Sequence, residues 1–142
     1  MIKLVILFSL LTGPGYVEKE VVKTYLEKIN FVEGLSTKYL LILPLNSNYY
    51  VDNHWVKGLL NLPNPYPALS VVIVERDVAL VRRIITNNRL KIAFDDKTYF
   101  YWTSFYTGEP ILLERKDKGY EIKILTIRNA YQEKLSLYKK IR

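Results

Sequence analysis

The chain contains no cysteine, one histidine and no methionine beyond Met1. Without cysteine it cannot form disulfides, bind zinc or iron–sulfur clusters through thiolates, or use a thiol nucleophile. It also lacks glycine-rich phosphate-binding patterns and the signatures of zinc fingers, helix-turn-helix domains and RNP motifs. We therefore expect no cofactor, no metal and no sequence-specific reading of nucleic acid.

His54 is the single histidine, flanked by Asp52, Asn53 and Trp55. A lone imidazole can act as a general base near neutral pH. However, no second histidine offers metal-ligand spacing, and no serine lies in a nucleophile elbow. We predict that His54 lies on the exposed side of a short helix, and the sequence favours a binding protein over an enzyme.

No apolar run is long enough to cross a bilayer as a helix. The N-terminal run, residues 3–11, has the outline of a short signal peptide, but no small-x-small cleavage site follows it. We predict a buried first strand, no transmembrane segment and a cytoplasmic protein. Gly13-Pro14-Gly15 would then be a turn; a nucleotide site is the alternative, although Pro14 removes one backbone donor.

The composition is that of an ordinary globular protein, with 49% hydrophobic and 25% charged residues. A chain of 142 residues predicts one domain spanning residues 1–142. Twelve tyrosines and a single glutamine, Gln132, are compatible with a thermophilic source, whereas the asparagine content argues against one.

The hydrophobic periodicity predicts alternating strands and helices, followed by strands alone and a last helix. Asp77 can cap the third helix, and Pro44 must end its strand. The last helix is expected to place Tyr131, Leu135 and Tyr138 on one face. Strands are predicted at 3–11, 38–45, 69–75, 89–94, 97–106, 111–116 and 120–127, and helices at 18–30, 52–60, 77–86 and from 129 or 130.

Early strand–helix alternation indicates a parallel sheet with right-handed crossovers. Asp117-Lys118-Gly119 between two strand-like runs is a hairpin signal. The expected fold is therefore a single-domain α/β protein with a mixed, mainly parallel sheet. Helices would cover both faces, and an antiparallel hairpin plus a helix would form the C-terminal part.

This order of elements resembles the thioredoxin fold. Pro110, followed by the hairpin and the last helix, matches that fold's second half, and the resemblance implies a cis bond before Pro110. The paired redox cysteines would fall within residues 46–55, which contain none. The resemblance therefore implies a cysteine-free interaction module and no dithiol chemistry.

Positive charge is concentrated at the C-terminal end. Residues 115–142 contain nine lysines and arginines but only three acidic residues, whereas the formal net charge of the whole chain is +7. Such a field attracts phosphate or acidic surfaces. The partners we expect are nucleic acid or an acidic protein surface. The candidate contact residues are Arg115, Lys116, Lys118, Lys123, Lys139 and Lys140.

An aromatic block, Tyr99-Phe100-Tyr101-Trp102, is the most unusual local feature. In a strand, Tyr99 and Tyr101 would share one face and Trp102 the other. Aromatic rings flanked by cations are used by proteins that bind single-stranded nucleic acid. Tyr99, Tyr101 and Trp102 are therefore candidate stacking groups, although aromatic residues are also common in strands for packing alone.

The enzymatic alternative is a Mg²⁺-dependent nuclease. Asp95 or Asp96 at the end of one strand, with Glu114 and Lys116 at the end of another, resembles the core of the PD-(D/E)xK nucleases. In that family two acids hold Mg²⁺ and the lysine positions the attacking water. Glu121-Ile122-Lys123 offers a second acid-x-Lys triplet. We expect a non-catalytic protein with a basic C-terminal binding face, and keep this nuclease as the alternative.

Overall fold

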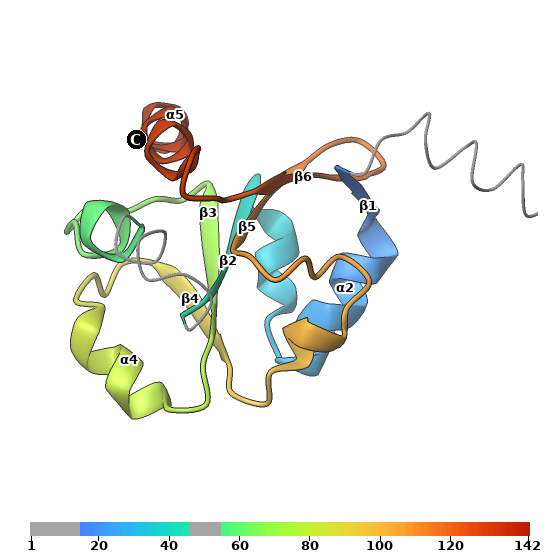
Figure 1. The fold of residues 1–142 in the computed structure, drawn as a ribbon, viewed down its shortest axis with the longest axis horizontal. Helices are drawn as coiled ribbons and strands as arrows, with labels where there is room; N and C mark the ends of the chain where they lie inside the picture. Colours follow the sequence, from blue (N-terminus) through green and yellow to red (C-terminus); the bar gives the residue numbers. More distant parts are fainter. Residues whose placement is uncertain (1–14, 46–54) are drawn as a thin grey trace, which may run out of the picture.

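The computed structural model describes residues 15–45 and 55–142. They form one six-stranded mixed sheet with the order β1-β6-β5-β2-β3-β4 (Figure 1). Its strands are β1 (Tyr16–Glu18), β2 (Tyr39–Pro44), β3 (Leu69–Val74), β4 (Lys91–Asp95), β5 (Ile111–Arg115) and β6 (Gly119–Ile124).

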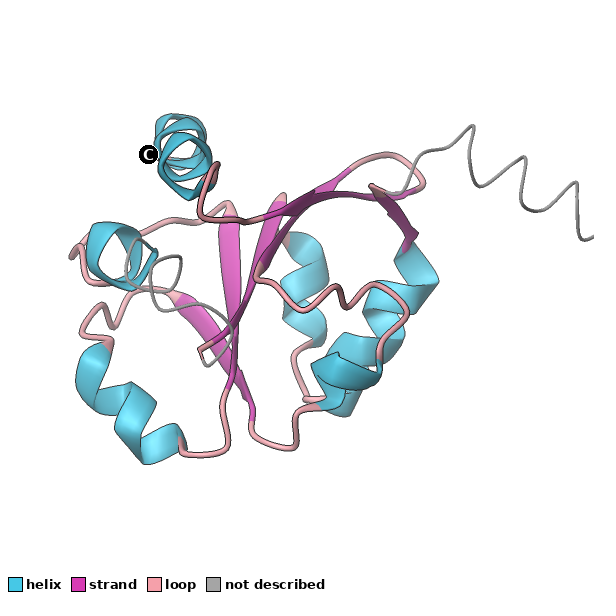
Figure 2. Ribbon diagram, viewed as in Figure 1, coloured by secondary structure: helices cyan, strands magenta, loops and turns pink. Residues whose placement is uncertain are grey.

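Helical segments cover both faces of the sheet (Figure 2). One face, here called the α5 face, packs against η2, α4 and α5, and the other, the α2 face, against α2, η1 and η3. The helices are α2 (Lys19–Lys28), α4 (Val78–Ile84) and α5 (Ala130–Ile141), the 3₁₀ segments η1 (Val32–Ser36) and η3 (Tyr99–Trp102), and the π-helical turn η2 (Val56–Leu60).

The central strands β2 and β3 are buried at every position, which explains their unbroken apolar sequences. They pair in parallel, and their alternate side chains enter the two separate cores. Leu41 and Val71 face α4 and α5, whereas Leu40 and Val72 face α2. Packing on both sides therefore holds the middle of the sheet in one register.

Local capping fixes the ends of two helices. Asp77 caps α4 by accepting a hydrogen bond from the Leu80 N–H at 3.0 Å, as the sequence predicts. α2 ends in a Schellman motif, in which the N–H of Phe31 donates to the Leu26 carbonyl and that of Asn30 to Glu27. Asn30 takes the left-handed conformation that this motif requires, with φ 55°.

The prediction of a mainly parallel sheet is wrong. Three of the five strand pairings are antiparallel, and only β2–β3 and β3–β4 are parallel. The predicted hairpin forms as β5 and β6, but it lies beside β2 within the sheet, with β1 outside it. The fold is therefore a small α/β domain with a mixed and mostly antiparallel sheet.

One further expectation concerns the aromatic block, and the burial of the last helix is now defined. Residues 97–106 do not form a strand, because Tyr99–Trp102 is a 3₁₀ helix. The last helix buries Ala130, Leu137 and Ile141, while Tyr131 and Leu135 are exposed.

Some predictions concern parts of the chain that the structure does not describe. The first strand at 3–11, Gly13-Pro14 and His54 all lie outside the described residues. Among residues 15–45 and 55–142 there is no cis peptide bond, so the cis bond implied before Pro110 is absent. Within the same ranges, no helix combines the length and apolar character needed to cross a bilayer.

Candidate ligand-binding groove

The C-terminal cations lie among acidic residues. Lys116 Nζ is 3.4 Å from a carboxylate oxygen of Glu114 and 3.6 Å from one of Glu121. Lys123 Nζ is 3.4 Å from a carboxylate oxygen of Glu133 on α5. Glu114, and to a lesser extent Glu121, raise the pKa of Lys116. The negative charges of these glutamates therefore offset much of the positive charge of Lys116 and Lys123.

The other four candidate cations are arranged as follows. Arg115 is exposed and its guanidinium donates to the Leu35 carbonyl at 3.0 Å. Lys140 lines a small depression together with Lys123, Glu114 and Glu133. Lys118 on the hairpin and Lys139 on α5 are exposed. Lys116, Lys123 and Lys140 thus lie close to the carboxylates of Glu114, Glu121 and Glu133, whereas Arg115 contacts η1 on the α2 face.

The aromatic block lies elsewhere. α5 and the turn from β4 into η3 occupy opposite ends of the sheet (Figure 1). Within η3, Phe100 is fully buried against Tyr25 and Phe105, and so anchors the turn. Trp102 is 85% exposed, and Tyr99 and Tyr101 are each 37% exposed. The structure therefore separates the candidate stacking groups from the basic C-terminal tract.

A buried carboxylate holds this turn in place. Asp95 ends β4, is fully buried, and accepts the backbone N–H of Tyr99 at 3.0 Å and that of Phe100 at 2.8 Å. It also accepts the Tyr25 hydroxyl at 2.9 Å. Thr98, in the left-handed region at φ 59°, reverses the chain between Asp95 and the aromatic residues. The carboxylate thus joins β4, α2 and η3.

These contacts strongly shift the ionisation of the Tyr25 hydroxyl. Burial, followed by the charge of Asp95 and its hydrogen bond, raises the pKa of Tyr25 far above the ordinary value of 10.0. Tyr25 is therefore a neutral hydrogen-bond donor to Asp95 at physiological pH.

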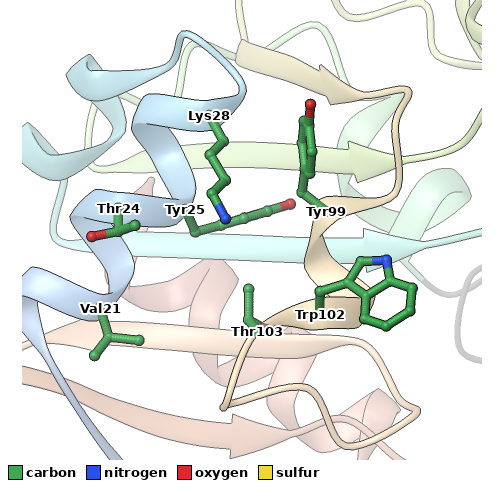
Figure 3. A pocket seen from close by; sticks show the side chains of 7 residues that line it. All are labelled: Val21, Thr24, Tyr25, Lys28, Tyr99, Trp102 and Thr103. Carbon is green, nitrogen blue, oxygen red and sulfur yellow. The ribbon is translucent and has the colours of Figure 1, made fainter.

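Beside this anchor lies a cavity of about 240 Å³ between α2 and η3 (Figure 3). Lys28 reaches over it from the last turn of α2, with its ammonium 5.8 Å from the centroid of the Tyr99 ring. The exposed Trp102 borders the same cavity. The residues that line it are Val21, Thr24, Tyr25, Lys28, Tyr99, Trp102 and Thr103.

A second cavity, of about 460 Å³, shares Lys28 and Tyr99 with the first. It carries two more cations, Arg82 from α4 and Lys97 from the turn after β4, and one carboxylate, Asp96. We call the two cavities together the aromatic groove. It lies beside the carboxyl end of β4, in the part of the sheet where β2, β3 and β4 are parallel. In α/β proteins, ligands bind at the carboxyl ends of parallel strands.

Of the predicted aromatic residues, Tyr99 and Trp102 line this groove, whereas Tyr101 lines a separate pocket with Glu75 and Arg76.

The cations of the groove were not predicted from the sequence. Lys28, Arg82 and Lys97 are far apart along the chain, and only Arg82 has another cation, Arg83, next to it. One signal was available, since Lys97 follows β4 directly and the ends of parallel strands meet at one edge. Lys28 enters from the opposite face of the sheet to Arg82, and no local pattern indicates that approach.

The residues of the nuclease alternative are not brought together. Asp95 is aligned through Val74 with Pro44, at the end of β2, whereas Glu114 is aligned with Tyr39 at its beginning. Five residues of strand correspond to about 16 Å. One Mg²⁺ with ligands at ~2.1 Å cannot bridge that separation. Among residues 15–45 and 55–142, no group of three or more acidic or histidine side chains could hold a metal ion.

Comparison of the chain with protein-family models, curated proteins and solved structures finds no match. The assignment of a function therefore rests on the geometry of the groove.

Proposed function

We propose that this protein is a non-catalytic binding protein for single-stranded nucleic acid and that the aromatic groove is its contact surface. One observation carries the proposal: Trp102 is 85% exposed beside Tyr99, whose ring lies under the ammonium of Lys28. Burying a large apolar side chain stabilises a protein by about 1.5–3 kcal/mol. An indole left in water forgoes that stabilisation, which suggests that a ligand covers it.

Nucleobases suit such a surface. A base stacked on an aromatic side chain contributes about 1–3 kcal/mol with little dependence on sequence. The bases of a duplex are already stacked on one another, so single strands supply the free ring faces. The absence of any sequence-reading motif agrees with this non-specific mode.

The charges of the groove also favour a polyanion. Lys28, Arg82 and Lys97 line it, opposed by the carboxylate of Asp96. The formal net charge of +7 on the whole chain would add long-range attraction. An acidic protein surface would meet the cations equally well, but it has no bases for Trp102. The aromatic rings therefore favour nucleic acid as the partner.

The thioredoxin-like interaction module stays a prediction. Its support is the hairpin followed by a terminal helix, β5, β6 and α5. It assigns no role to the groove.

The test is a binding titration of fluorescein-labelled (dT)₂₀, followed by anisotropy at low salt. Trp102→Ala should weaken binding by about tenfold or more, as expected from the loss of one stacked base. Tyr131→Ala is the matched control, since Tyr131 is 50% exposed on α5, away from the groove. It should bind like the wild type.

Polyglutamate serves as a polyanion without bases. It should compete poorly with (dT)₂₀ at equal charge. If polyglutamate binds tightly and Trp102→Ala has no effect on it, the partner is an acidic protein surface. If (dT)₂₀ fails to bind at low salt, the proposed function is wrong.

A further inference from the structure

The larger cavity of the groove has an unusual set of cations. Three segments meet there: the end of α2 with Lys28, α4 with Arg82, and the turn after β4 with Lys97. Asp96 is the one carboxylate that lines it. Counting formal charges on these lining residues leaves an excess of two positive charges.

Arg82 lies against an aromatic ring. Its guanidinium lies over the ring of Phe94, with its carbon 4.9 Å from the ring centroid. A stacked guanidinium keeps its edge N–H groups free to donate in the plane, and the paired N–H groups match two phosphate oxygens. A guanidinium placed in this way can donate two hydrogen bonds to a phosphate group.

The C-terminal end of α2 carries partial negative charge on its last carbonyls, which repels an anion. This repulsion is weaker than at an uncapped helix end. The carbonyls of Leu26 and Glu27 already accept from Phe31 and Asn30 in the Schellman motif. The Asn30 side chain lines the same cavity and adds amide N–H donors. The cavity thus offers donors from both faces of the sheet.

We propose that the larger cavity binds a terminal phosphate of the nucleic-acid strand, while the adjoining cavity takes the neighbouring base beside Tyr99 and Trp102. A phosphomonoester carries about −1.5 to −2 charges near neutral pH, which matches the excess of two positive charges better than the single charge of an internal phosphodiester. One sugar separates a phosphate from its base, and Lys28 and Tyr99 border both cavities. This inference rests on the proposed function and names the ligand unit that its groove recognises.

The experiment uses the full chain and three thymidine trinucleotides, measured by isothermal titration calorimetry. One carries a 5′-phosphate, one a 3′-phosphate, and one has hydroxyl groups at both ends. A terminal phosphate at one of the two ends should tighten binding by about tenfold, through charge-assisted hydrogen bonds. The end that gives the gain assigns the polarity of the strand.

The double variant Arg82→Gln/Lys97→Gln should lose this gain and still bind the hydroxyl-ended trinucleotide. Both side chains are exposed, and circular dichroism checks that the fold is kept. Lys139→Gln/Lys140→Gln, with the same change in net charge on α5, should retain the full gain.

Equal affinity for all three trinucleotides would overturn the inference. So would a gain that survives in Arg82→Gln/Lys97→Gln. If (dT)₂₀ still binds through Trp102 in that case, the proposed function stands. If a phosphorylated trinucleotide binds with the expected gain and (dT)₂₀ does not, the phosphate site stands and the proposed function fails.

Discussion

At the scale of single residues, Asp95 determines where the aromatic side chains lie. Its two carboxylate oxygens accept three hydrogen bonds, from the Tyr25 hydroxyl and from the backbone of Tyr99 and Phe100. A carboxyl group at the end of a strand resembled a metal ligand in the sequence. Its partner Tyr25 lies 70 residues away in the chain, so no local pattern could reveal its structural role.

Asp95→Ala should lower the free energy of unfolding by about 2 kcal/mol or more, because it leaves two buried donors and one partly buried donor unpaired. Urea denaturation measures this change. The matched control is Asp96→Ala, the exposed neighbour, which should stay within about 0.5 kcal/mol of the wild type. Equal stability of the two variants would contradict the role assigned to Asp95.

The raised pKa of Tyr25 predicts a loss of stability in alkali. Below pH 10 the tyrosine is neutral in both the folded and the unfolded state. Above the unfolded value of 10.0, the unfolded chain releases this proton while the folded chain retains it, so stability falls as pH rises. The contribution of this one group is up to about 1.4 kcal/mol per pH unit.

Other buried tyrosines with a raised pKa, Tyr120 among them, contribute in the same direction. The informative quantity is therefore the difference between proteins. Tyr25→Phe should show a shallower decline of the unfolding free energy between pH 10 and 11 than the wild type. If the unfolding free energy of the two proteins falls equally between pH 10 and 11, the pKa of Tyr25 is not raised by folding and this prediction is wrong.

At the scale of secondary structure, burial on both sides made β2 and β3 predictable. Their apolar runs need no tertiary information to be recognised. The strand predicted over the aromatic run Tyr99–Trp102 was wrong because the structure of this segment depends on tertiary contacts. Its alternating rings fit a strand, but the left-handed turn at Thr98 and the Asp95 carboxylate favour a 3₁₀ helix.

The register of the outer strands depends on Gly119. A Cβ at this position would meet the Val17 carbonyl on β1 and lie 2.6 Å from the Tyr16 hydroxyl oxygen. Gly119→Ala should therefore destabilise the fold by about 1–3 kcal/mol, measured by thermal or urea unfolding.

Gly58→Ala in η2 provides the comparison. Its Cβ would meet only the flexible end of the Lys134 side chain, 2.6 Å from Nζ, which can move aside. Its effect should stay below about 1 kcal/mol. A larger loss for Gly58→Ala than for Gly119→Ala would argue against β1–β6 pairing as described.

At the scale of the whole molecule, net charge was a poor guide to the location of the candidate site. The C-terminal tract holds most of the net positive charge of the sequence, yet Lys116 and Lys123 are paired with glutamates there. The groove collects its cations from three separate elements. Only the three-dimensional arrangement distinguishes a paired cation from one that faces a cavity.

The salt dependence of binding follows from these groove cations. Contacts of Lys28, Arg82 and Lys97 with phosphates should give a slope of log K against log salt of about −2 for a single strand. The affinity for (dT)₂₀ should fall by about twentyfold between 50 and 200 mM salt. Arg82→Gln/Lys97→Gln should reduce the slope to about −0.7, whereas an unchanged slope would place the phosphate contacts elsewhere.

The most direct test of the groove is an NMR titration of the ¹⁵N-labelled protein with (dT)₈. The chain has two tryptophans, and Trp55 is fully buried while Trp102 is exposed. The indole N–H signal of Trp102 should shift or broaden on binding, and that of Trp55 should stay in place. If instead the Trp102 signal remains unchanged while the amides of α5 shift, nucleic acid binds to the C-terminal face and the account of the groove is wrong.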